Sequence, residues 1–342
     1  MTLAGSIAEQ SVLVTGGTGF IGGGLVRGLL GRGCDVSCLV RATSCVDALR
    51  VSGARLIVGD VVDREAVAGA IAAANARVVF HLAGRVRALD AEEFMRVNVG
   101  GVEAVAQACA DQRESPVLVL VSSLAAAGHT GDRPAVESDF PVPVSDYGRS
   151  KLAGEQAAIA YAGKVPLTVV RPCIVFGAGD RGMFEVFKPI ARSGLHAVIG
   201  AGNARFSLIA VADLVDCLML AAERGERVTS GNAGQGIYFA AADDVAFVEL
   251  GPLIARALDK PPPRILHMPA WSMQAIGRLG DAVSRIRGRP GWVGSDKIRE
   301  VLAGSWTCSS AKARQQLGWS PAAPFADRLR ETAQWYRDAG WL

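Results

Sequence analysis

The stretch "VLVTGGTGFIGGGLVRGLL", residues 12–30, decides the fold. A short apolar run leads directly into three glycines spaced three apart, Gly16, Gly19 and Gly22, and then into a helical pattern. The first glycine allows a tight turn, the second lets the backbone approach a pyrophosphate, and the third lets the helix pack closely on the strand. A glycine triplet alone is weak evidence, but between a strand and a helix it indicates a dinucleotide-binding loop.

Short apolar runs and helical segments continue to alternate along the chain. The runs with strand character are residues 11–16, 35–40, 54–60, 76–84, 116–123 and 167–172. Runs this apolar suit strands that are covered on both faces, and therefore a parallel sheet with crossover helices. We predict an α/β protein with a Rossmann-type, doubly wound parallel sheet.

Beyond Pro172 the alternation becomes less regular. "ADLVDCLMLAAERG" predicts a helix starting near Asp213, "GIYFAA" a strand, and "AFVELGPLIARAL" another helix before the breaker "KPPPR". We predict a dinucleotide-binding domain over residues 8–176 and a smaller, mainly substrate-binding α+β lobe over 177–342. The boundary is not sharp, because later strands can rejoin the sheet.

Composition excludes several classes of protein. The chain has 342 residues, 50% of them hydrophobic, which is typical of a globular protein with a sizeable core. A net charge of +3 without a long basic run argues against a nucleic-acid partner. The seven cysteines occur singly, without the Cys-x-x-Cys spacing of metal sites, so we expect reduced thiols and no metal.

The N-terminal segment "MTLAGSIAEQ" lacks the basic and apolar regions of a secretory signal. No run of about 18 apolar residues occurs, so a membrane span is not expected. We therefore expect a soluble, cytoplasmic protein.

The stretch "SDYGRSKLAGE", residues 145–155, places Tyr147 and Lys151 four positions apart in a helical pattern. At this spacing the two side chains share one face of a helix. A neighbouring ammonium favours the phenolate and lowers the pKa of a tyrosine, which suits a general acid or base. Two ordinary exposed helix residues are the alternative, and the motif alone does not decide between them.

The ordered motifs of the whole chain resemble the extended short-chain dehydrogenase/reductase family. The segments that carry the resemblance are "TGGTGFIG", "GDVVD" at 59–63, "FHLAG" at 80–84, "VNVGG" at 97–101, "VSSLAAAG" at 121–128, "YGRSK", "RPCIVFG" at 171–177 and the C-terminal "WTCSSAKARQQLGWSP". Their order and spacing are similar to those of the family over almost the full length of the chain.

The resemblance implies a catalytic set of Ser123, Tyr147 and Lys151. In the family the tyrosine exchanges a proton with a substrate oxygen, and the serine hydrogen-bonds the same oxygen. The lysine holds the nicotinamide ribose and lowers the pKa of the tyrosine. Ser122 is expected to face the sheet instead. Hydride then passes between the nicotinamide and the carbon that bears this oxygen.

The resemblance also implies cofactor contacts at the ends of the strands. They are Gly16, Gly19, Phe20, Ile21 and Gly22 at the pyrophosphate, Asp60 and Val61 at the adenine, Leu82, Ala83, Gly84 and Asn98 near the nicotinamide ribose, Pro172 and Cys173 at the carboxamide end, and Tyr147 with Lys151. His81 is expected to pack beneath a loop without an acid–base role.

The end of the second predicted strand distinguishes the two nicotinamide cofactors. A carboxylate there would bind the ribose hydroxyl of NAD, whereas a basic residue accommodates the 2′-phosphate of NADP. Val40 is followed by Arg41, which favours NADP(H), although NAD(H) stays open because Arg41 could be a solvated loop residue.

Two positions suggest the branch of the family. Enzymes of the nucleotide-sugar branch commonly carry an asparagine where this chain has Ile174, and a diphosphate-binding arginine where it has Phe206, with Arg205 one place early. The chain instead resembles the branch of 3β-hydroxysteroid dehydrogenases and dihydroflavonol reductases, which act on ketones and secondary alcohols of hydrophobic molecules. A nucleotide-sugar epimerase or dehydratase with tightly bound NAD is the alternative. A cofactor-binding protein without turnover is a third hypothesis, against which the Ser-Tyr-Lys set argues.

The segment 267–300 combines apolar residues at roughly helical spacing with arginines over residues 278–289. These are Trp271, Met273, Ile276, Leu279 and Val283, with Arg278, Arg285, Arg287 and Arg289. Core packing of the small lobe and an apolar lid over the substrate are the expected roles. Peripheral membrane contact by a basic amphipathic helix is the alternative.

The family resemblance also predicts a homodimer. The predicted helices within residues 97–111 and 147–162 are rich in small side chains, which would allow close packing between two copies. The substrate, the reaction direction and the stereochemistry are not predicted.

Overall fold

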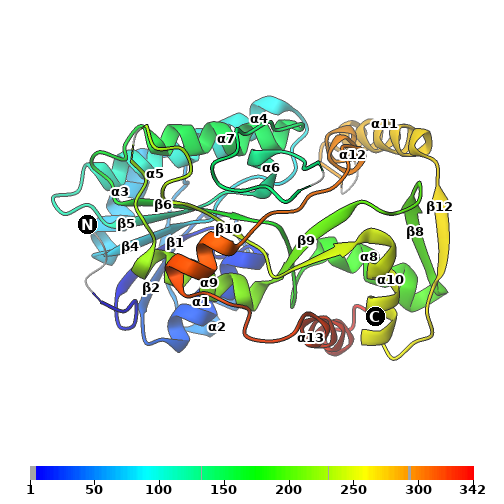
Figure 1. Ribbon diagram of the computed structural model, residues 1–342. Helices are drawn as coiled ribbons and strands as arrows, with labels where there is room; N and C mark the ends of the chain where they lie inside the picture. The colour runs from blue at the N-terminus through cyan, green and yellow to red at the C-terminus, as the bar shows by residue number, and fades with distance from the viewer. Residues whose placement is uncertain (1–4, 132, 230, 292–293) are drawn as a thin grey trace.

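The computed structural model describes residues 5–131, 133–229, 231–291 and 294–342. The prediction about a secretory signal falls partly on residues 1–4, which lie outside the described part. Seven strands form one parallel sheet with the order β10-β6-β5-β4-β1-β2-β3 (Figure 1). Its strands are β1 (Ser11–Thr15), β2 (Asp35–Val40), β3 (Arg55–Val58), β4 (Val78–His81), β5 (Val117–Val121), β6 (Leu167–Pro172) and β10 (Ile237–Ala240). The predicted Rossmann-type α/β fold is confirmed.

Helices cover both faces of this sheet. On one face lie α1 (Phe20–Gly31), α2 (Asp47–Ser52) and α9 (Val211–Arg224) (Figure 1). On the other lie α3 (Arg64–Ala74), α5 (Gly100–Ala110) and α7 (Asp146–Ile159), with α4 (Ala91–Asn98) and α6 (Leu124–Ala127) at the edge where the strands end. The strands alternate between two cores, because successive side chains point to opposite faces. Val12 and Val14 of β1 enter one core, and Leu13 enters the other.

The glycine turn after β1 is enforced by close backbone contacts. Gly16 has a φ of +76°, and a Cβ atom there would lie 2.6 Å from the amide nitrogen of Ala83. A Cβ atom on Gly22 would lie 2.1 Å from the carbonyl oxygen of Gly16. Neither position accepts a side chain, so both glycines are required by the geometry of the turn.

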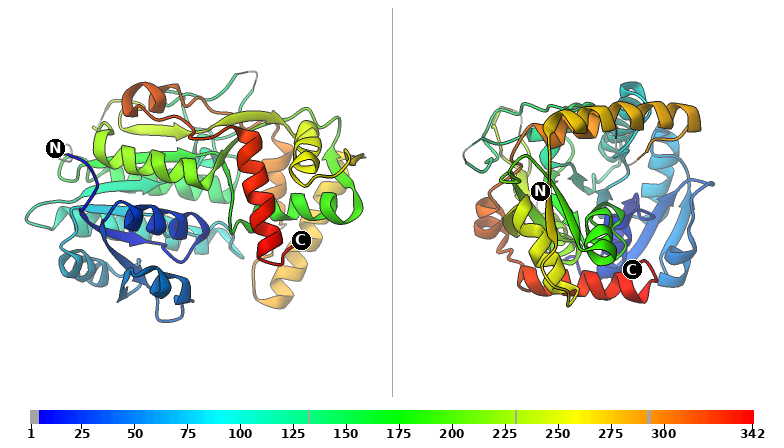
Figure 2. Two further views of the ribbon diagram at one scale, coloured as in Figure 1. Left: turned by 90° about the horizontal axis from the view of Figure 1, so that it is seen from below. Right: turned by 90° about the vertical axis from the view of Figure 1, so that its right-hand side faces the viewer.

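The remaining elements form a smaller lobe beyond the ends of the strands (Figures 1 and 2). They are the sheet β11-β9-β7 and the ribbon β12-β8, with β7 (Ile174–Phe176), β8 (Leu195–Ile199), β9 (Arg205–Ala210), β11 (Asp243–Ala246) and β12 (Arg264–Met268). The helices are α8 (Arg181–Ser193), α10 (Phe247–Ala257), α11 (Ala270–Arg287), α12 (Ser295–Leu302) and α13 (Phe325–Asp338). The short η1 (Ala313–Leu317) packs instead against α9 and β10 of the larger unit. A third core fills this lobe around Phe187, Ile254 and Tyr336.

Two elements beyond residue 177 belong to the large sheet. Strand β10 pairs with β6, and α9 packs against α1 on the sheet face. The predicted strand "GIYFAA" and the helix near Asp213 are therefore present, but as parts of the larger unit. The division into domains at residues 176 and 177 stays a prediction.

Within the described residues, no helix combines the length and the apolar character needed to cross a bilayer.

A buried ion pair joins α7 to β6. The guanidinium of Arg171 donates two hydrogen bonds to the carboxylate of Glu155, at 2.9 Å from Nε and 2.6 Å from an Nη atom. The two side chains are only 4% and 1% exposed, respectively. Burial opposes the charge on Arg171, but Glu155 more than compensates and the pKa of Arg171 is raised.

We predict that Glu155→Gln lowers the free energy of unfolding by about 3–5 kcal/mol, because it leaves the buried Arg171 charge uncompensated. Urea unfolding followed by circular dichroism measures the change. Replacing both residues by apolar ones of similar size should recover most of this loss. Glu114→Gln, which removes an exposed ion pair with Arg77, is the matched control and should cost about 1 kcal/mol or less. Equal losses in the two single variants would contradict the prediction.

Candidate active site

Helix α7 presents Tyr147 and Lys151 toward the ends of the strands. Ser145 caps the helix, because its hydroxyl accepts a hydrogen bond from the amide of Gly148 at 2.9 Å. The close packing of α7 on α4 requires Gly154, where a Cβ atom would lie 2.4 Å from the carbonyl oxygen of Asn98. The spacing of four residues thus gives one shared helix face, as predicted from the sequence.

The electrostatics of this pair differ from the prediction that the lysine lowers the pKa of the tyrosine. Burial raises the pKa of Tyr147 to about 12, opposed by a hydrogen bond with Ser123 and reinforced by the negative charge of Glu300. The ammonium of Lys151 donates to the carbonyl oxygen of Val121 at 2.8 Å, and burial lowers its pKa to about 8. The phenol is therefore a protonated acid at neutral pH, because desolvation dominates over nearby charge.

Ser123 stands at the end of β5 and is the N-cap of α6. Its hydroxyl accepts a hydrogen bond from the amide of Ala125 at 3.1 Å. Ser122 is buried, and its hydroxyl has no hydrogen-bond partner among the residues that the structure describes. The two neighbours therefore face different surroundings, and Ser123 is the one that lies with Tyr147 along a cavity.

The turn between β1 and α1 fits a dinucleotide pyrophosphate. Gly19 is the exposed N-cap of α1, Phe20 and Ile21 open the helix, and the first turn contains no acidic residue. Free amide groups at a helix N-terminus attract anions. A side chain at Gly16 would collide with the backbone of Ala83, so glycine keeps the loop close to the end of β4. Two observations support a cofactor here: the N-terminus of α1 has no side-chain cap and no acidic residue, and the backbone of Gly16 lies close to that of Ala83.

The loop after β4 is fixed from behind by Asn98. The side-chain oxygen of Asn98 accepts from the amide of Arg85 at 2.7 Å, while its nitrogen donates to the carbonyl oxygen of Arg85 and to Ser150 of α7. Asn98 is itself buried. By holding the backbone of Arg85, Asn98 fixes the position of the preceding residues Leu82, Ala83 and Gly84. Its contact with a ribose stays a prediction.

The remaining predicted cofactor residues line the ends of neighbouring strands. Arg41 follows β2 and is exposed, as is Asp60 after β3, whereas Val61 is buried. Pro172 ends β6, and Cys173 follows it as a buried thiol whose pKa is raised by burial. These residues follow strands of one parallel sheet, so they meet at a single edge.

His81, at the end of β4, is buried beneath the glycine turn. Its Nδ1 atom lies 2.7 Å from the hydroxyl of Thr15. Burial, with a smaller contribution from the charge of Lys151, lowers the pKa of His81 to about 3. The imidazole is therefore neutral, in agreement with a packing role. No group of three or more potential metal ligands occurs in the described ranges.

A cavity of about 910 Å³ opens beside Ser123 and Tyr147 and extends into the small lobe. Its apolar wall comes mainly from β7, β9, α8 and α10, and includes Val175, Met183, Val186, Leu208, Phe247 and Leu250. Ile174 and Phe206, the two positions that distinguish the branches of the family, both line it. Arg205 bonds instead to the carbonyl oxygen of Asp244. A cavity of this volume and lining suits an apolar molecule.

Sequence reasoning missed the part of the site that comes from α12. The carboxylate of Asp296 accepts hydrogen bonds from the amides of Asp146 at 2.7 Å and Tyr147 at 3.2 Å. The hydroxyl of Ser145 donates to Glu300 at 2.7 Å. A segment 150 residues further along the chain therefore supplies the acceptors and the negative charge that a helix N-terminus favours. No motif marks these carboxylates in the sequence.

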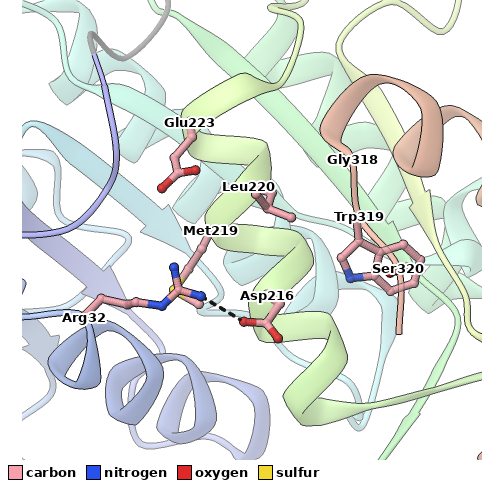
Figure 3. Close-up of a pocket in the computed structure, with 8 residues that line it drawn as sticks. All are labelled: Arg32, Asp216, Met219, Leu220, Glu223, Gly318, Trp319 and Ser320. Atoms are coloured by element: carbon pink, nitrogen blue, oxygen red, sulfur yellow. Dashed lines mark ion pairs between the residues drawn. The ribbon is translucent and has the colours of Figure 1, made fainter. Parts of the chain in front are cut away.

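A second pocket, of about 210 Å³, lies between α1, α9 and the loop at Trp319 (Figure 3). An ion pair between Arg32 and Asp216, 3.5 Å apart, spans it. Ser123, Tyr147 and Lys151 do not line this pocket, so it is separate from the candidate active site.

Comparisons with known proteins agree with this fold and this arrangement of motifs. The model of the NAD dependent epimerase/dehydratase family matches residues 12–234. The chain belongs to this family and is an NAD(P)-dependent oxidoreductase, as the resemblance implied.

Its relatives act on both apolar and sugar substrates. Ceramide reductase of Caulobacter vibrioides is 30% identical, over 98% of this chain and 97% of that protein. A 4-hydroxy-2-methyl-3-oxo-4-farnesyl-3,4-dihydroquinoline-1-oxide ketoreductase of Stigmatella aurantiaca is 30% identical, over 90% and 91% respectively. UDP-glucose 4-epimerase of Vibrio cholerae is 26% identical, over 96% of each. Among solved structures, gox2253 superposes with a TM-score of 0.78 at 24% identity, over 97% of this chain and 99% of that one.

We predict that Asp296→Asn lowers kcat about tenfold for any substrate that the wild-type protein turns over, because Tyr147 is the candidate acid and displacement of such a group is costly. The change weakens the anchor of the α7 N-terminus and so displaces Tyr147. The KM for the nucleotide should change little, since Asp296 contacts the start of α7 and Arg299, none of which belongs to the glycine turn. Steady-state kinetics measure both. Asp327→Asn, which alters an exposed ion pair on α13, is the control. An unchanged kcat in Asp296→Asn would refute the assigned positioning role.

Proposed function

We propose that this enzyme is an NADP(H)-dependent reductase or dehydrogenase for a ketone or secondary alcohol of a hydrophobic small molecule. The observation that carries the proposal is the apolar cavity that begins at Ser123 and Tyr147 and continues past Ile174 and Phe206. A diphosphate at these two positions would meet the apolar side chains of Ile174 and Phe206 instead of polar partners. The Caulobacter and Stigmatella relatives are named as reductases of a ceramide and of a farnesyl-bearing ketone, which supports the same substrate class.

A nicotinamide dinucleotide in this site would supply or accept the hydride. In reduction, the phenol of Tyr147 donates its proton to the carbonyl oxygen, and Ser123 donates a hydrogen bond to the same oxygen. In oxidation, the same groups act in reverse. Burial raises the pKa of Tyr147 to about 12, so the phenol is protonated at neutral pH, as its role as proton donor in reduction requires. Lys151 is proposed to hold the nicotinamide ribose.

The proposed cofactor contacts follow the edge of the sheet. Gly16, Gly19, Phe20, Ile21 and Gly22 face the pyrophosphate, and Asp60 and Val61 the adenine. Leu82, Ala83, Gly84, Asn98, Pro172 and Cys173 complete the nicotinamide end. Residues 8–176 would then form the cofactor domain and 177–342 mainly the substrate lobe. A homodimer and a cytoplasmic location stay predictions.

We predict that Tyr147→Phe lowers kcat/KM for reduction by about 10²–10⁴, the range of a lost general acid. Binding of the nucleotide should stay within a factor of about three, because the variant keeps the ring and loses only the hydroxyl. NADPH oxidation with a panel of hydrophobic ketones and fluorescence titration of NADPH measure the two effects. Tyr161→Phe, two residues beyond the end of α7, is the matched control. Retention of most turnover in Tyr147→Phe would rule out the proposed acid.

Arg41 provides the test of cofactor preference. We predict that Arg41→Ala weakens NADPH binding at least tenfold and leaves NADH binding nearly unchanged, because a charge-assisted contact to the 2′-phosphate is lost. Isothermal titration with each nucleotide measures the ratio. Arg50→Ala, which removes a neighbouring exposed arginine on α2, should leave the ratio unchanged.

The alternative function is that of a nucleotide-sugar epimerase or dehydratase. The similarity to the Vibrio UDP-glucose 4-epimerase favours it, and it predicts a tightly bound NAD instead of an exchanging NADP(H). Such an enzyme holds NAD through its cycle. Denaturing freshly purified protein and identifying any released nucleotide by mass spectrometry distinguishes the two. Bound NAD that does not exchange with added NADPH would overturn both the role of Arg41 and the reductase proposal.

A further inference from the structure

Helix α11 carries an apolar stripe that faces away from the rest of the molecule. Trp271, Leu279 and Ile286 are 72%, 67% and 86% exposed. Together with Ala275 and Ala282 they recur every three or four residues, which places them on one face of the helix. The helix runs across the outside of the small lobe (Figures 1 and 2). Core packing was expected for Trp271 and Leu279, and their exposure contradicts it.

The opposite face of α11 belongs to the substrate cavity. Asp281 and Ser284 line the cavity, as do Gly291 and Gly294 in the loop that leads to α12. Arg285 also lines it, from the border between this face and the exposed stripe. Gly277 packs against Ile298 of α12, where a Cβ atom would lie 2.9 Å away. The helix is therefore a wall of the cavity on one side and an exposed apolar surface on the other. The expected lid role fits only the inner face.

Positive charge flanks the exposed stripe. Arg278, Arg285, Arg287 and Arg289 are exposed, and none forms an ion pair with another residue that the structure describes. The only acidic residue of the helix, Asp281, turns inward, because its carboxylate accepts a hydrogen bond from the amide of Ser295. An apolar stripe bordered by arginines complements a surface that combines acyl chains with negatively charged headgroups.

We propose that α11 is an interfacial helix that binds the surface of an anionic lipid bilayer. Trp271, Leu279 and Ile286 insert among the headgroups and upper acyl chains, while Arg278, Arg287 and Arg289 contact lipid phosphates. The cavity wall formed by Ser284 and Arg285 then lies next to the bilayer. An apolar substrate could pass from the membrane to Tyr147 past this helix. The membrane contact is independent of the proposed reaction. The passage of substrate past α11, in contrast, rests on the proposed function.

Flotation with vesicles of phosphatidylglycerol and phosphatidylcholine tests the contact on the full-length protein, without substrate. The wild type should float with mixed vesicles, less so with phosphatidylcholine alone, and less at high salt. Leu279→Ser combined with Arg278→Gln should lower the partition coefficient more than tenfold, because each lost arginine alone accounts for about a fivefold change. Val51→Ser with Arg50→Gln, an exposed adjacent pair on α2, is the matched control and should float like the wild type.

NADPH affinity and the unfolding midpoint of the α11 double variant should equal those of the wild type, which shows that the variant is folded. Absence of wild-type flotation would overturn the proposal, as would equal binding of the α11 and α2 variants. Binding that ignores lipid charge would also overturn it. If Leu279→Ser instead dissociates a dimer in lipid-free solution, then α11 is a contact between copies and the proposal is wrong. The flotation assay contains no substrate, so none of these outcomes bears on the reductase proposal, which the Tyr147 and Arg41 variants test separately.

Discussion

The buried ion pair between Glu155 and Arg171 fixes the helix on which the site depends. It joins α7, which carries Tyr147 and Lys151, to the end of β6, where the chain enters the substrate cavity at Cys173. Removing two charges from water is costly, and the bidentate geometry compensates for much of this cost. The pair therefore joins α7 to the end of β6 through two directional hydrogen bonds.

The other end of α7 is fixed by a different kind of interaction. Asp296 accepts from the first amides of the helix, and Glu300 binds the hydroxyl of its capping residue. Burial is the main cause of the raised pKa of Tyr147, and the charge of the same Glu300 adds to it, so the small lobe makes the phenol a weaker acid as well as fixing its helix. At this end of the cavity the charged groups are mutually paired, since Arg299 binds both Asp146 and Asp296. Because Asp146, Asp296 and Arg299 neutralise one another, they provide little net charge for binding a ligand.

The sequence was sufficient to predict the parts of the protein that depend on local pattern. The glycine turn, the apolar strands and the shared face of Tyr147 and Lys151 follow from spacing alone, because each involves neighbouring residues. The contacts of Asp296 and Glu300 could not be predicted, since they join segments 150 residues apart and carboxylates on a helix are usually solvated. The pKa of Tyr147 was also mispredicted, because burial is a property of the assembled fold and here outweighs nearby charge.

Helix α11 shows why an amphipathic pattern is ambiguous without a structure. Periodicity identifies two faces, but it does not say which one is covered. Here glycine and serine, at Gly277 and Ser284, form the covered face, and Trp271, Leu279 and Ile286 remain outside. Small residues allow close approach to α12, whereas exposure of the apolar side chains of Trp271 and Ile286 to water is unfavourable. Their exposure is the reason for proposing a partner surface, and the surrounding arginines favour a surface with negative charge.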